Sequence, residues 1–361
     1  MRNHQPFISC ILPPYILLNI ARNGNSEERE FALRAIALDQ SLRTNRLTYS
    51  LPGGLKLSHL VLLSHSLKEK RSIYDAGHLQ DLPGKLVRSE SQPAVADTAV
   101  NQAYEGLGDT FNFFWKVYDR NSIDDAGMPL TASVHFDKNY DNAFWNGQQM
   151  VFGDGDGMIF TGFTGSTDVI GHELTHGVTG SEANLNYQGQ PGALNESISD
   201  VFGSMVKQYK HNQTAQQADW LIGAGILMKG IQGVALRSMK APGTAYDDPK
   251  LGKDPQPATM SGFVETAEDN GGVHINSGIP NHAFYLTATA LGGHSWEKAG
   301  QIWYDTLVDK NLKSNASFAT FANLTTQKAS ARYGAGSAEQ KAVQDSWFKV
   351  GVLKTAKVVV S

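Results

Sequence analysis

The chain has 361 residues, of which 41% are hydrophobic and 18% are charged, as is ordinary for a globular protein with room for two domains and a large core. With 31 basic and 35 acidic residues, its net charge of −4 gives no electrostatic support for binding nucleic acid or an anionic membrane. The single cysteine, Cys10, excludes an internal disulfide. We therefore expect a monomer whose fold rests on packing and bound metal.

The first 50 residues are predicted to form a small helical module. Asn25 is placed to cap a helix, with Glu28 as its capping-box partner. Apolar side chains recur at helical spacing at Phe31, Ala35, Leu38 and Leu42 and stop in the polar segment 43–46. A module this short cannot bury a core of its own, so we expect it to dock on the rest of the chain. A disordered tail, the alternative, would not carry so apolar a stripe.

Residues 51–180 are predicted to form a strand-rich lobe that contains one long helix, at 97–119. Strands and turns are expected between 55 and 92, beginning with the alternating segment 55–58, and at 133–136 and 149–152. The glycine-dense segment 153–157 lacks the spacing and the closing glutamate of a calcium-binding hand. We interpret it as a turn.

The motif His172-Glu173-Leu-Thr-His176 closes this lobe. On a helix the two histidines project from one face, which is the spacing at which both bind one zinc ion. Glu173 is offset by one residue and can reach a water on the metal without displacing it. The same five-residue pattern also occurs on helices with surface histidines, so further groups are needed.

The next helical segment supplies these groups. Catalytic zinc takes three protein ligands and keeps a fourth position for water. Glu196 and Asp200 lie one turn apart, so a single face presents one carboxylate to the metal and another behind it. The second carboxylate is placed to accept the remaining ring N–H of a ligand histidine. We therefore predict His172, His176 and Glu196 as zinc ligands, with Asp200 behind them.

Residues 181–361 are predicted to form a helical lobe. The expected helices share the apolar period of 3.6 residues and are 194–209, 216–230, 277–291, 295–309, 316–333 and 337–349. The fold class is therefore α+β, with the zinc helix at the junction of two lobes, where clefts usually form.

The loop 268–278 carries a further candidate, His274. Its two glycines let the backbone bring the histidine into a cleft, where Asp269 can orient the imidazole. The alternative is a structural or merely exposed histidine, and only the need of a zinc site for a charge stabiliser favours a functional role.

Four segments, in this order along the chain, resemble the thermolysin family of neutral metalloendopeptidases. They are Asn142-Ala-Phe-Trp-Asn-Gly147, the zinc motif, Ala193-Leu-Asn-Glu-Ser-Ile-Ser-Asp200 and Asp269-Asn-Gly-Gly-Val-His274. The resemblance runs from about Arg71 to Gly351, and the short N-terminal module with Pro13-Pro14-Tyr15 is similar to the prosegment of the protealysin-like subgroup. It implies a thermolysin-like two-lobe fold and a zinc endopeptidase made as a zymogen and matured by autocatalytic cleavage.

The resemblance also implies catalytic roles. Glu173 would deprotonate the zinc water and hand the proton to the leaving amine. Tyr187 would donate to the tetrahedral oxyanion together with His274, and Asp269 would orient His274. Asp200 would stand behind His172.

Further residues are implied in binding the substrate. The Asn142 side chain and the Ala143 backbone would grip the substrate main chain, and Arg237 would bind the carbonyl after the scissile bond. Apolar residues would line a pocket for a bulky apolar residue on the amine side of the cut, and these are Phe160, Phe163, Val169, Ile222 and Leu236. For each of these taken alone, core packing is the alternative.

The chain departs from the family pattern at the paired calcium site that thermolysin carries. Asp168 and Asp219 remain, but Lys207, Leu221 and Ala224 stand where acidic ligands are expected. A lysine ammonium can neutralise the remaining carboxylates without any metal. Zinc is therefore the expected cofactor, and the sequence argues against calcium at this site.

Two other classes of function are weighed against a protease. A catalytically inactive relative that acts as a binding module would have no need of Glu173. A structural zinc protein would close its metal with four protein ligands, whereas three are found here. Both observations favour the protease.

The prosegment contains the only cysteine of the chain. Cys10 lies three residues before Pro13-Pro14-Tyr15; thiolate is a good zinc ligand, and a rigid Pro-Pro segment holds the chain extended. We therefore predict that Cys10, or the backbone beside it, occupies the water position in the zymogen until cleavage near residues 44–58 releases it. An inert thiol in an apolar segment is the alternative.

The expected partners are protein and peptide substrates and the prosegment itself, docked at the active-site cleft. The apolar runs around Cys10 faintly resemble a secretion signal, but Pro13 and Pro14 interrupt them and no clean cleavage site is present after them. We expect secretion by a route without an evident cleavable signal peptide, with a cytoplasmic location as the alternative.

Overall fold

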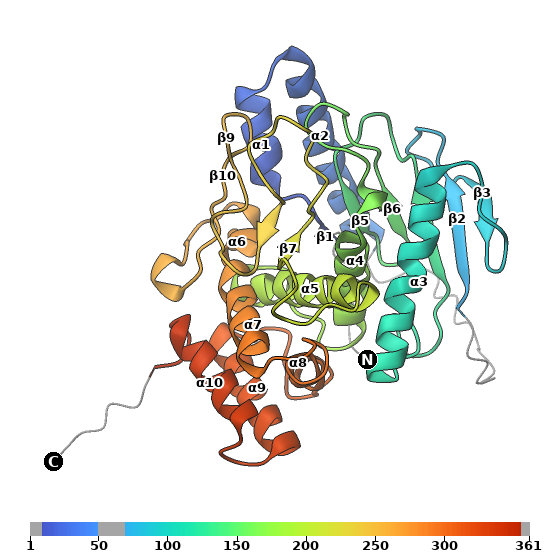
Figure 1. The fold of residues 1–361 in the computed structure, drawn as a ribbon. Helices are drawn as coiled ribbons and strands as arrows, with labels where there is room; N and C mark the ends of the chain where they lie inside the picture. The colour runs from blue at the N-terminus through green and yellow to red at the C-terminus, as the bar shows by residue number, and fades with distance from the viewer. Residues whose placement is uncertain (1–8, 50–68, 355–361) are drawn as a thin grey trace.

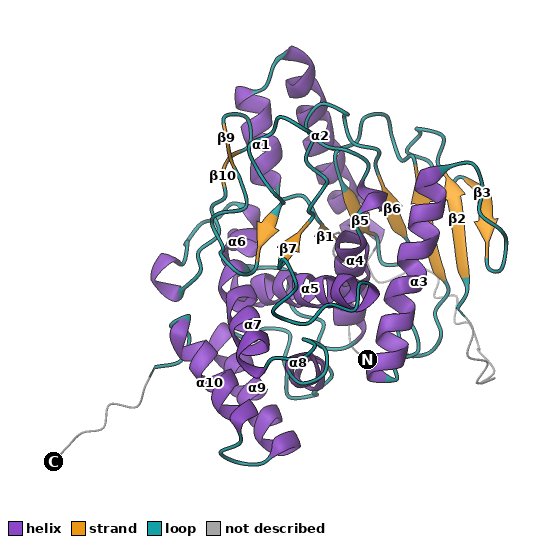
Figure 2. Cartoon of the chain, in the orientation of Figure 1, coloured by secondary structure: helices purple, strands orange, loops and turns teal. Residues whose placement is uncertain are grey.

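The computed structural model describes residues 9–49 and 69–354, so the predicted segment 55–58 lies outside the described residues. In Figure 1 the N-terminal helices lie at the top, a sheet-bearing lobe lies on the right and the C-terminal helices lie at the bottom, with α4 and α5 at the centre. Figure 2 shows that the C-terminal part is mainly helical, whereas the larger strands gather in the other lobe. The α+β fold with two lobes is therefore confirmed.

A six-stranded sheet forms the centre of the N-terminal lobe, in the order β1-β5-β6-β4-β2-β3. Strands β2, β4 and β6 are parallel to one another, and the other neighbouring pairs are antiparallel. The strands are β1 (Ser9–Cys10), β2 (Arg71–Asp75), β3 (Lys85–Ser89), β4 (Leu130–Val134), β5 (Ala143–Trp145) and β6 (Met150–Phe152). Every residue of β5 and β6 is buried, so these two strands lie within the core.

Helix α3 (Thr98–Tyr118) confirms the predicted helix at 97–119. Asp97 caps it by accepting hydrogen bonds from Ala99 N and Val100 N, and Asp119 ends it in a left-handed conformation. An aspartate cap satisfies backbone N–H groups that have no partner within the helix. The helix lies across the sheet in Figure 1 and packs against β2 and α4.

Helices α4 (Thr167–Ser181) and α5 (Gly189–Lys210) pack closely against each other at the centre of the molecule. Gly203 allows this approach, because a Cβ atom there would lie 2.4 Å from the carbonyl oxygen of Asp168 and 2.9 Å from His172 N. Only a residue without a side chain fits at this crossing. The crossing brings the carboxylates of α5 to the histidines of α4.

The C-terminal lobe contains five further helices: α6 (Asp269–Asn276), α7 (Gly278–Leu291), α8 (Ala299–Leu307), α9 (Phe318–Tyr333) and α10 (Ala338–Lys349). The predicted helices at 277–291, 316–333 and 337–349 are confirmed to within two residues, and the one at 295–309 is shorter than predicted. Trp303 and Trp347 stack with ring centroids 6.0 Å apart in the core of this lobe. The indole of Trp347 donates to Thr325 Oγ1 at 2.9 Å, so its polar atom is satisfied.

The predicted helix at 216–230 is wrong. This segment contains the short strand β7 (Leu221–Ile222), which pairs with β8 (Arg237–Ser238). Three of its glycines, Gly223, Gly225 and Gly230, have positive φ, a backbone conformation that cannot continue a helix. Two more short strands, β9 (Asp247–Asp248) and β10 (Gly252–Lys253), form a hairpin further on.

The N-terminal module is a pair of helices, α1 (Pro14–Asn23) and α2 (Ser26–Tyr49), which pack side by side (Figure 1). The predicted capping box is present: Asn25 Oδ1 accepts from Glu28 N at 3.0 Å and Glu28 Oε2 accepts from Asn25 N at 2.8 Å. Of the predicted stripe, Ala35 and Leu38 are buried, whereas Phe31 and Leu42 are half-buried.

Two features of this module differ from the sequence-based expectation. Helix α2 continues to Tyr49, past the predicted stop at 43–46. Helix α1 was not predicted, and Pro14 and Tyr15 are its first residues, so only Pro13 remains extended (φ −64°, ψ 141°). Proline fits the first helical position because its missing N–H needs no partner there. None of the described helices is long and apolar enough to cross a membrane.

Candidate active site

Helix α4 carries both histidines of the motif on one face. Their Nε2 atoms lie 3.0 Å apart, and both side chains are buried. The opposite ring nitrogens are occupied, because His172 Nδ1 lies 2.8 Å from Asp200 Oδ1 and His176 Nδ1 lies 2.8 Å from Asn195 Oδ1. These partners hold the two rings so that their Nε2 atoms converge on one point.

Glu196 of α5 completes this group. Its Oε2 atom lies 3.4 Å from His172 Nε2, and its Oε1 atom lies 3.5 Å from His176 Nε2. The ligand atoms of the three residues all lie within 4.8 Å of one another. Sequence reasoning missed Asn195, although it directly precedes Glu196 and an amide oxygen is a usual partner for a ligand histidine.

The chemistry of this group fits a zinc ion. Two imidazole nitrogens and a carboxylate are the donors that zinc takes in catalytic sites with three protein ligands. Glu196 Oε2 is buried and has no hydrogen-bond partner among the described residues. Although burial lowers the pKa of His172, the carboxylates of Asp200 and Glu196 outweigh this effect and raise it to about 9. Burial, by contrast, lowers the pKa of His176 to about 4, which favours the neutral imidazole that a metal ion requires.

Glu173 lies beside this group on α4 and is fully buried. Its Oε2 atom accepts a hydrogen bond from Trp145 N at 3.1 Å, and its Oε1 atom has no partner among the described residues. Burial raises the pKa of this carboxyl well above its usual range. A carboxylate held in this way, with one free oxygen, is ready to accept a proton.

Tyr187 and His274 face the same point from the other lobe. The Tyr187 hydroxyl donates to Glu196 Oε1 and lies 3.3 Å from His274 Nε2. Asp269 holds His274 twice, with Oδ1 at 2.6 Å from the ring Nδ1 and Oδ2 accepting from His274 N at 2.8 Å. The ring therefore presents Nε2 to the site.

The segment that carries His274 is not entirely the loop expected. Asn270, Gly271 and Gly272 have positive φ and form a left-handed turn, after which the chain is helical to Asn276. The two glycines make this turn possible without steric strain. His274 thus lies at the start of a helix, directly after the turn.

Arg237 and Asn142 contact the N-terminal module. Arg237 donates from Nε and Nη2 to Asp200 at 2.8 Å each, and from Nη1 to the carbonyl oxygen of Ile11 at 2.9 Å. Asn142 Oδ1 accepts from Leu12 N at 3.1 Å. Both residues predicted to hold a substrate main chain are therefore bonded to the main chain of residues 11–12.

Strand β1 extends these contacts toward the metal group. It pairs antiparallel with β5, with Cys10 opposite Phe144. Ile11 N donates to Ala143 O at 3.2 Å, and the carbonyl oxygen of Cys10 lies 3.2 Å from His274 Nε2. Cys10 itself is buried. The group of metal-ligating side chains found within 4.8 Å contains the two histidines and the glutamate but not the Cys10 thiol.

The residues predicted to line an apolar pocket are all buried, with exposed fractions of 0–1%, and these are Phe160, Phe163, Val169, Ile222 and Leu236. They belong to the hydrophobic core that runs through the described parts of both lobes and also includes Ile11. Leu236 N donates to Ile222 O at 3.0 Å, which joins two of them through the backbone.

Sequence reasoning also missed Asp39 of α2. This buried carboxylate accepts from Tyr140 Oη at 2.5 Å and from Asn142 Nδ2 at 3.1 Å. A single aspartate in a long helix gives no signal in the sequence. It lies on the face that docks, one residue after the predicted stripe residue Leu38.

Lys207 of α5 lies in the region where the family pattern would place the paired calcium site. Its ammonium lies 3.1 Å from Asp168 Oδ2 and 3.0 Å from Asp219 Oδ1, and it donates to the carbonyl oxygen of Leu221 at 2.8 Å. Although burial lowers the pKa of Lys207, the two carboxylates raise it above its ordinary value. The lysine is therefore held in its charged form between the carboxylates.

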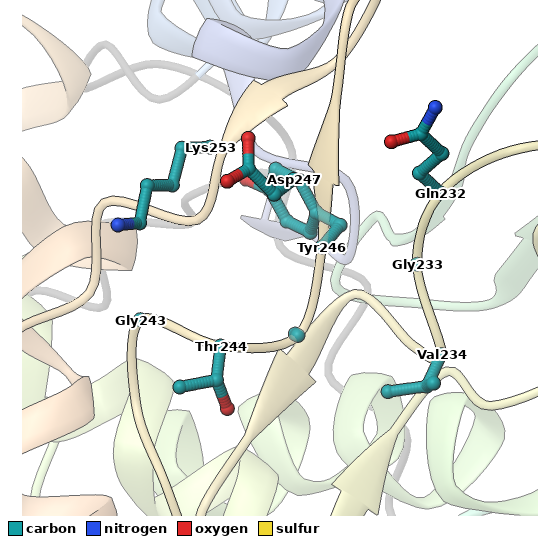
Figure 3. Close-up of a pocket in the computed structure, with 9 residues that line it drawn as sticks. Gln232, Gly233, Val234, Gly243, Thr244, Tyr246, Asp247 and Lys253 are labelled. Carbon is teal, nitrogen blue, oxygen red and sulfur yellow. The ribbon is translucent and has the colours of Figure 1, made fainter.

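An open pocket lies beside the β9–β10 hairpin, and Figure 3 shows its lining residues. One side of the pocket is formed by Asp247 and Lys253, which are cross-strand partners in the hairpin. Val234 and Thr244 line the pocket away from these two residues. No residue predicted for the active site lines this pocket. Asn19 of α1 donates to the carbonyl oxygen of Leu251 in the same hairpin at 2.8 Å, so the pocket borders the docked prosegment and lies outside the metal group.

Comparison with known proteins places this architecture in a family. Residues 54–180 match the family model described as the thermolysin metallopeptidase catalytic domain, and residues 183–352 match the thermolysin metallopeptidase alpha-helical domain. The chain therefore belongs to the thermolysin family of metallopeptidases. It is a zinc-dependent neutral endopeptidase with a zymogen form, a hydrolase that acts on peptide bonds.

Individual relatives are similar over nearly the whole chain. An "Extracellular metalloprotease" of Pectobacterium carotovorum subsp. carotovorum is 56% identical over 96% of this chain and 96% of its own. "Protease PrtS" of Photorhabdus sp. (strain Az29) is 50% identical over 95% of this chain and 91% of its own. The solved precursor of protealysin, a metalloproteinase from Serratia proteamaculans, is 54% identical with a TM-score of 0.87, covering 96% of this chain and 100% of that one.

Proposed function

We propose that the chain is the secreted, latent precursor of this endopeptidase, and that residues 1–50 inhibit it by occupying the substrate cleft. The observation that carries the proposal is the set of main-chain hydrogen bonds between residues 10–12 and the cleft. An extended peptide that adds to a sheet edge binds mainly through such bonds. The extracellular names of the relatives support secretion.

The alignment of this segment supports a substrate preference. The carbonyl of Cys10 faces His274 and the next carbonyl is bound by Arg237, so the Cys10–Ile11 bond takes the place of the scissile bond. Ile11 then stands for the residue on the amine side of the cut, and it is fully buried as part of the hydrophobic core. The mature enzyme therefore prefers bulky apolar residues at that position.

The catalytic roles follow from the same arrangement. His172, His176 and Glu196 would hold a zinc ion, which would supply a Lewis acid to the site. Glu173 takes a proton from the water through its free oxygen and passes it to the leaving nitrogen, a role typically worth ~10²–10⁴-fold in rate.

Two donors stabilise the carbonyl oxygen as it gains negative charge. His274 donates from Nε2, and Tyr187 donates from its hydroxyl once it turns from Glu196. Asp269 positions His274, and it also favours the positive imidazolium form: burial lowers the pKa of His274, but Asp269 and Glu196 raise it above its ordinary value.

The chain is divided by function into three units. Residues 1–50 form the inhibitory prosegment, residues 51–180 form the lobe that ends in the zinc helix, and residues 181–361 form the helical lobe. The division is supported by the position of α4 between the two lobes (Figure 1).

Sequencing the products of a digested peptide library tests the substrate preference. Apolar residues such as leucine and isoleucine on the amine side of the cut are expected. A library in which acidic or basic residues dominate that position would contradict the alignment of Ile11.

A precursor that cannot be processed tests inhibition by the prosegment and by Cys10. Such a precursor is expected to hydrolyse a small peptide far more slowly than the mature enzyme. Cys10→Ser separates two modes of inhibition, because a thiolate at the water position would be lost whereas the main-chain contacts of residues 10–12 would remain. Unchanged latency would exclude the thiolate and leave steric blockage by the prosegment.

A further inference from the structure

Three neighbouring parallel strands of the sheet end at a cluster of metal-ligating side chains that the active site does not use. Strands β2, β4 and β6 lie side by side and run in the same direction, so their carboxyl ends meet at one edge of the sheet. His78 is the third residue after β2, His135 follows β4 directly, and Asp154 is the second residue after β6. Ligands of open α/β sheets commonly bind at such an edge.

The three side chains lie within reach of a single ion. His135 Nδ1 lies 2.9 Å from each Asp154 oxygen, and His78 Nδ1 lies 3.5 Å from Asp154 Oδ2. The ligand atoms of all three lie within 4.8 Å of one another, the same limit that the catalytic group meets. Ligand atoms about 3.3 Å apart surround a tetrahedral zinc ion with bonds of ~2.0–2.1 Å, so only small side-chain movements are needed.

The segments that carry the two imidazoles are joined, and the ring of His135 is held in place, before any ion binds. The backbone N–H of His78 donates to the carbonyl oxygen of His135 at 2.8 Å. On its far side, His135 Nε2 lies 2.8 Å from Asp97 Oδ2, while Asp97 Oδ1 caps helix α3. This fixes the ring with Nδ1 facing Asp154. His172 is held in the same way by Asp200, with a carboxylate on the ring nitrogen that the metal does not use.

The cluster is also accessible. The side chains of His78, Asp154 and His135 are 57%, 33% and 19% exposed, whereas the catalytic ligands are buried. An ion can therefore enter from solvent, and a water can complete its coordination. Two imidazoles and one carboxylate suit borderline divalent ions such as zinc more than calcium or magnesium, which prefer oxygen ligands.

We propose that His78, His135 and Asp154 form a second site for a divalent transition-metal ion, of which Zn²⁺ is the one we would test, and that Asp97 positions His135 for it. The ion joins the segments that follow β2, β4 and β6. Because it binds only where the sheet has formed, it stabilises the folded lobe by mass action.

Without an ion the cluster is held by charge. The pKa of His135 is raised to about 9, first by its hydrogen bond to Asp154 and then by Asp97, although burial opposes this. The groups facing this ring are these two carboxylates and His78.

Zinc titration of the full-length chain tests the site. The chain carries Glu173→Ala to prevent self-digestion and is loaded with its catalytic zinc before the titration. One additional equivalent of Zn²⁺ is expected, with a rise of a few degrees in melting temperature.

Variants assign the additional zinc to these residues. His78→Ala is expected to lose the second equivalent and the thermal shift, and Asp97→Asn to weaken binding by about 10–100-fold. His211→Ala, which removes an exposed histidine outside the cluster, is the matched control and is expected to bind as the parent does. The proposal is overturned if the parent takes up no second zinc, or if His78→Ala binds it as tightly as the parent.

Discussion

The α4–α5 helix pair and the prosegment interface are both built from buried polar groups, but they are built differently. Where the helices cross, His172 of α4 bonds to Asp200 of α5, and Arg237 donates two hydrogen bonds to the same carboxylate. At the prosegment interface, Asp39 and the main chain of residues 10–12 bond to cleft groups. The three side chains of the first set are fully buried, and Asp200 also accepts from Asn281 Nδ2 at 2.8 Å. The interface instead uses groups that can receive a substrate main chain, among them Nη1 of Arg237.

Under the proposed function, this difference makes the helix pair permanent and the prosegment removable. Removing one member of an enclosed charge network leaves the others unpaired in the core, which costs several kcal/mol. When the prosegment leaves, its contacts are replaced by water or by a substrate main chain. Substitutions in the helix pair and at the prosegment interface should therefore change different properties, and their effects should differ in size.

The largest expected effect is on the chemical step. Glu173→Ala in the mature enzyme should lower peptide hydrolysis by ~10²–10⁴-fold and leave zinc bound, because Glu173 is not among the three ligands. Activity assays and elemental analysis of the same sample measure both. Glu105→Ala, which removes an exposed carboxylate of α3, serves as the control. Activity within about tenfold of the parent would show that Glu173 is not the general base.

A smaller but still large effect is expected at His274. His274→Phe should lower kcat by about 10²–10³-fold and change KM less, since its hydrogen bond strengthens as the oxyanion forms. Steady-state kinetics of the mature enzyme, with His211→Ala as the control, separates the two constants. A change in KM alone would assign His274 to substrate binding.

At the prosegment interface, we expect a substitution to relieve part of the inhibition of the precursor. Asp39→Ala removes the carboxylate that accepts from Tyr140 and Asn142, and losing such a buried hydrogen-bond acceptor costs about 1–3 kcal/mol. In a precursor that cannot be processed, hydrolysis of a small peptide should rise about 5–150-fold. Glu30→Ala, an exposed position on the same helix, should leave latency as it is. If the two variants behave alike, Asp39 does not hold the prosegment.

The smallest effect is expected from calcium. Because the ammonium of Lys207 lies between Asp168 and Asp219, millimolar calcium should shift the melting temperature by less than about 1 °C, whereas a ligand well above its Kd stabilises by several kcal/mol. Lys207→Glu removes the competing charge and should create a calcium-dependent shift. A large shift in the parent would reveal a calcium site elsewhere in the chain.

Much of the fold could be predicted from local patterns. The capped helix α3 and the helices of the C-terminal lobe have apolar residues at helical spacing, and the capping box of Asn25 and Glu28 marks the start of α2. The predicted helix at 216–230 failed because apolar residues there alternate with glycines that take positive φ. Helix α1 was missed because Pro13 and Pro14 were interpreted as one extended segment, although proline is well suited to a first helical turn.

The candidate site, too, could be predicted from local patterns only in part. Spacing alone placed His172, His176, Glu196 and Asp200, because each pair lies on one helical face. No spacing rule predicts that Cys10 O reaches His274 or that Asp39 reaches Asn142, since these contacts depend on the register of β1 against β5 and on how α2 docks. Contacts between segments about 100 residues or more apart are decided by tertiary packing.

The pairing of β1 with β5 has a consequence for targets of the mature enzyme. Once the prosegment leaves, β5 becomes the edge of the sheet, and an edge strand binds only a chain whose own amide and carbonyl groups are unpaired. A residue inside a stable helix or sheet cannot offer them. Cleavage of a native target should therefore follow the fraction of time that the target segment is locally unfolded, more than the number of suitable side chains it contains.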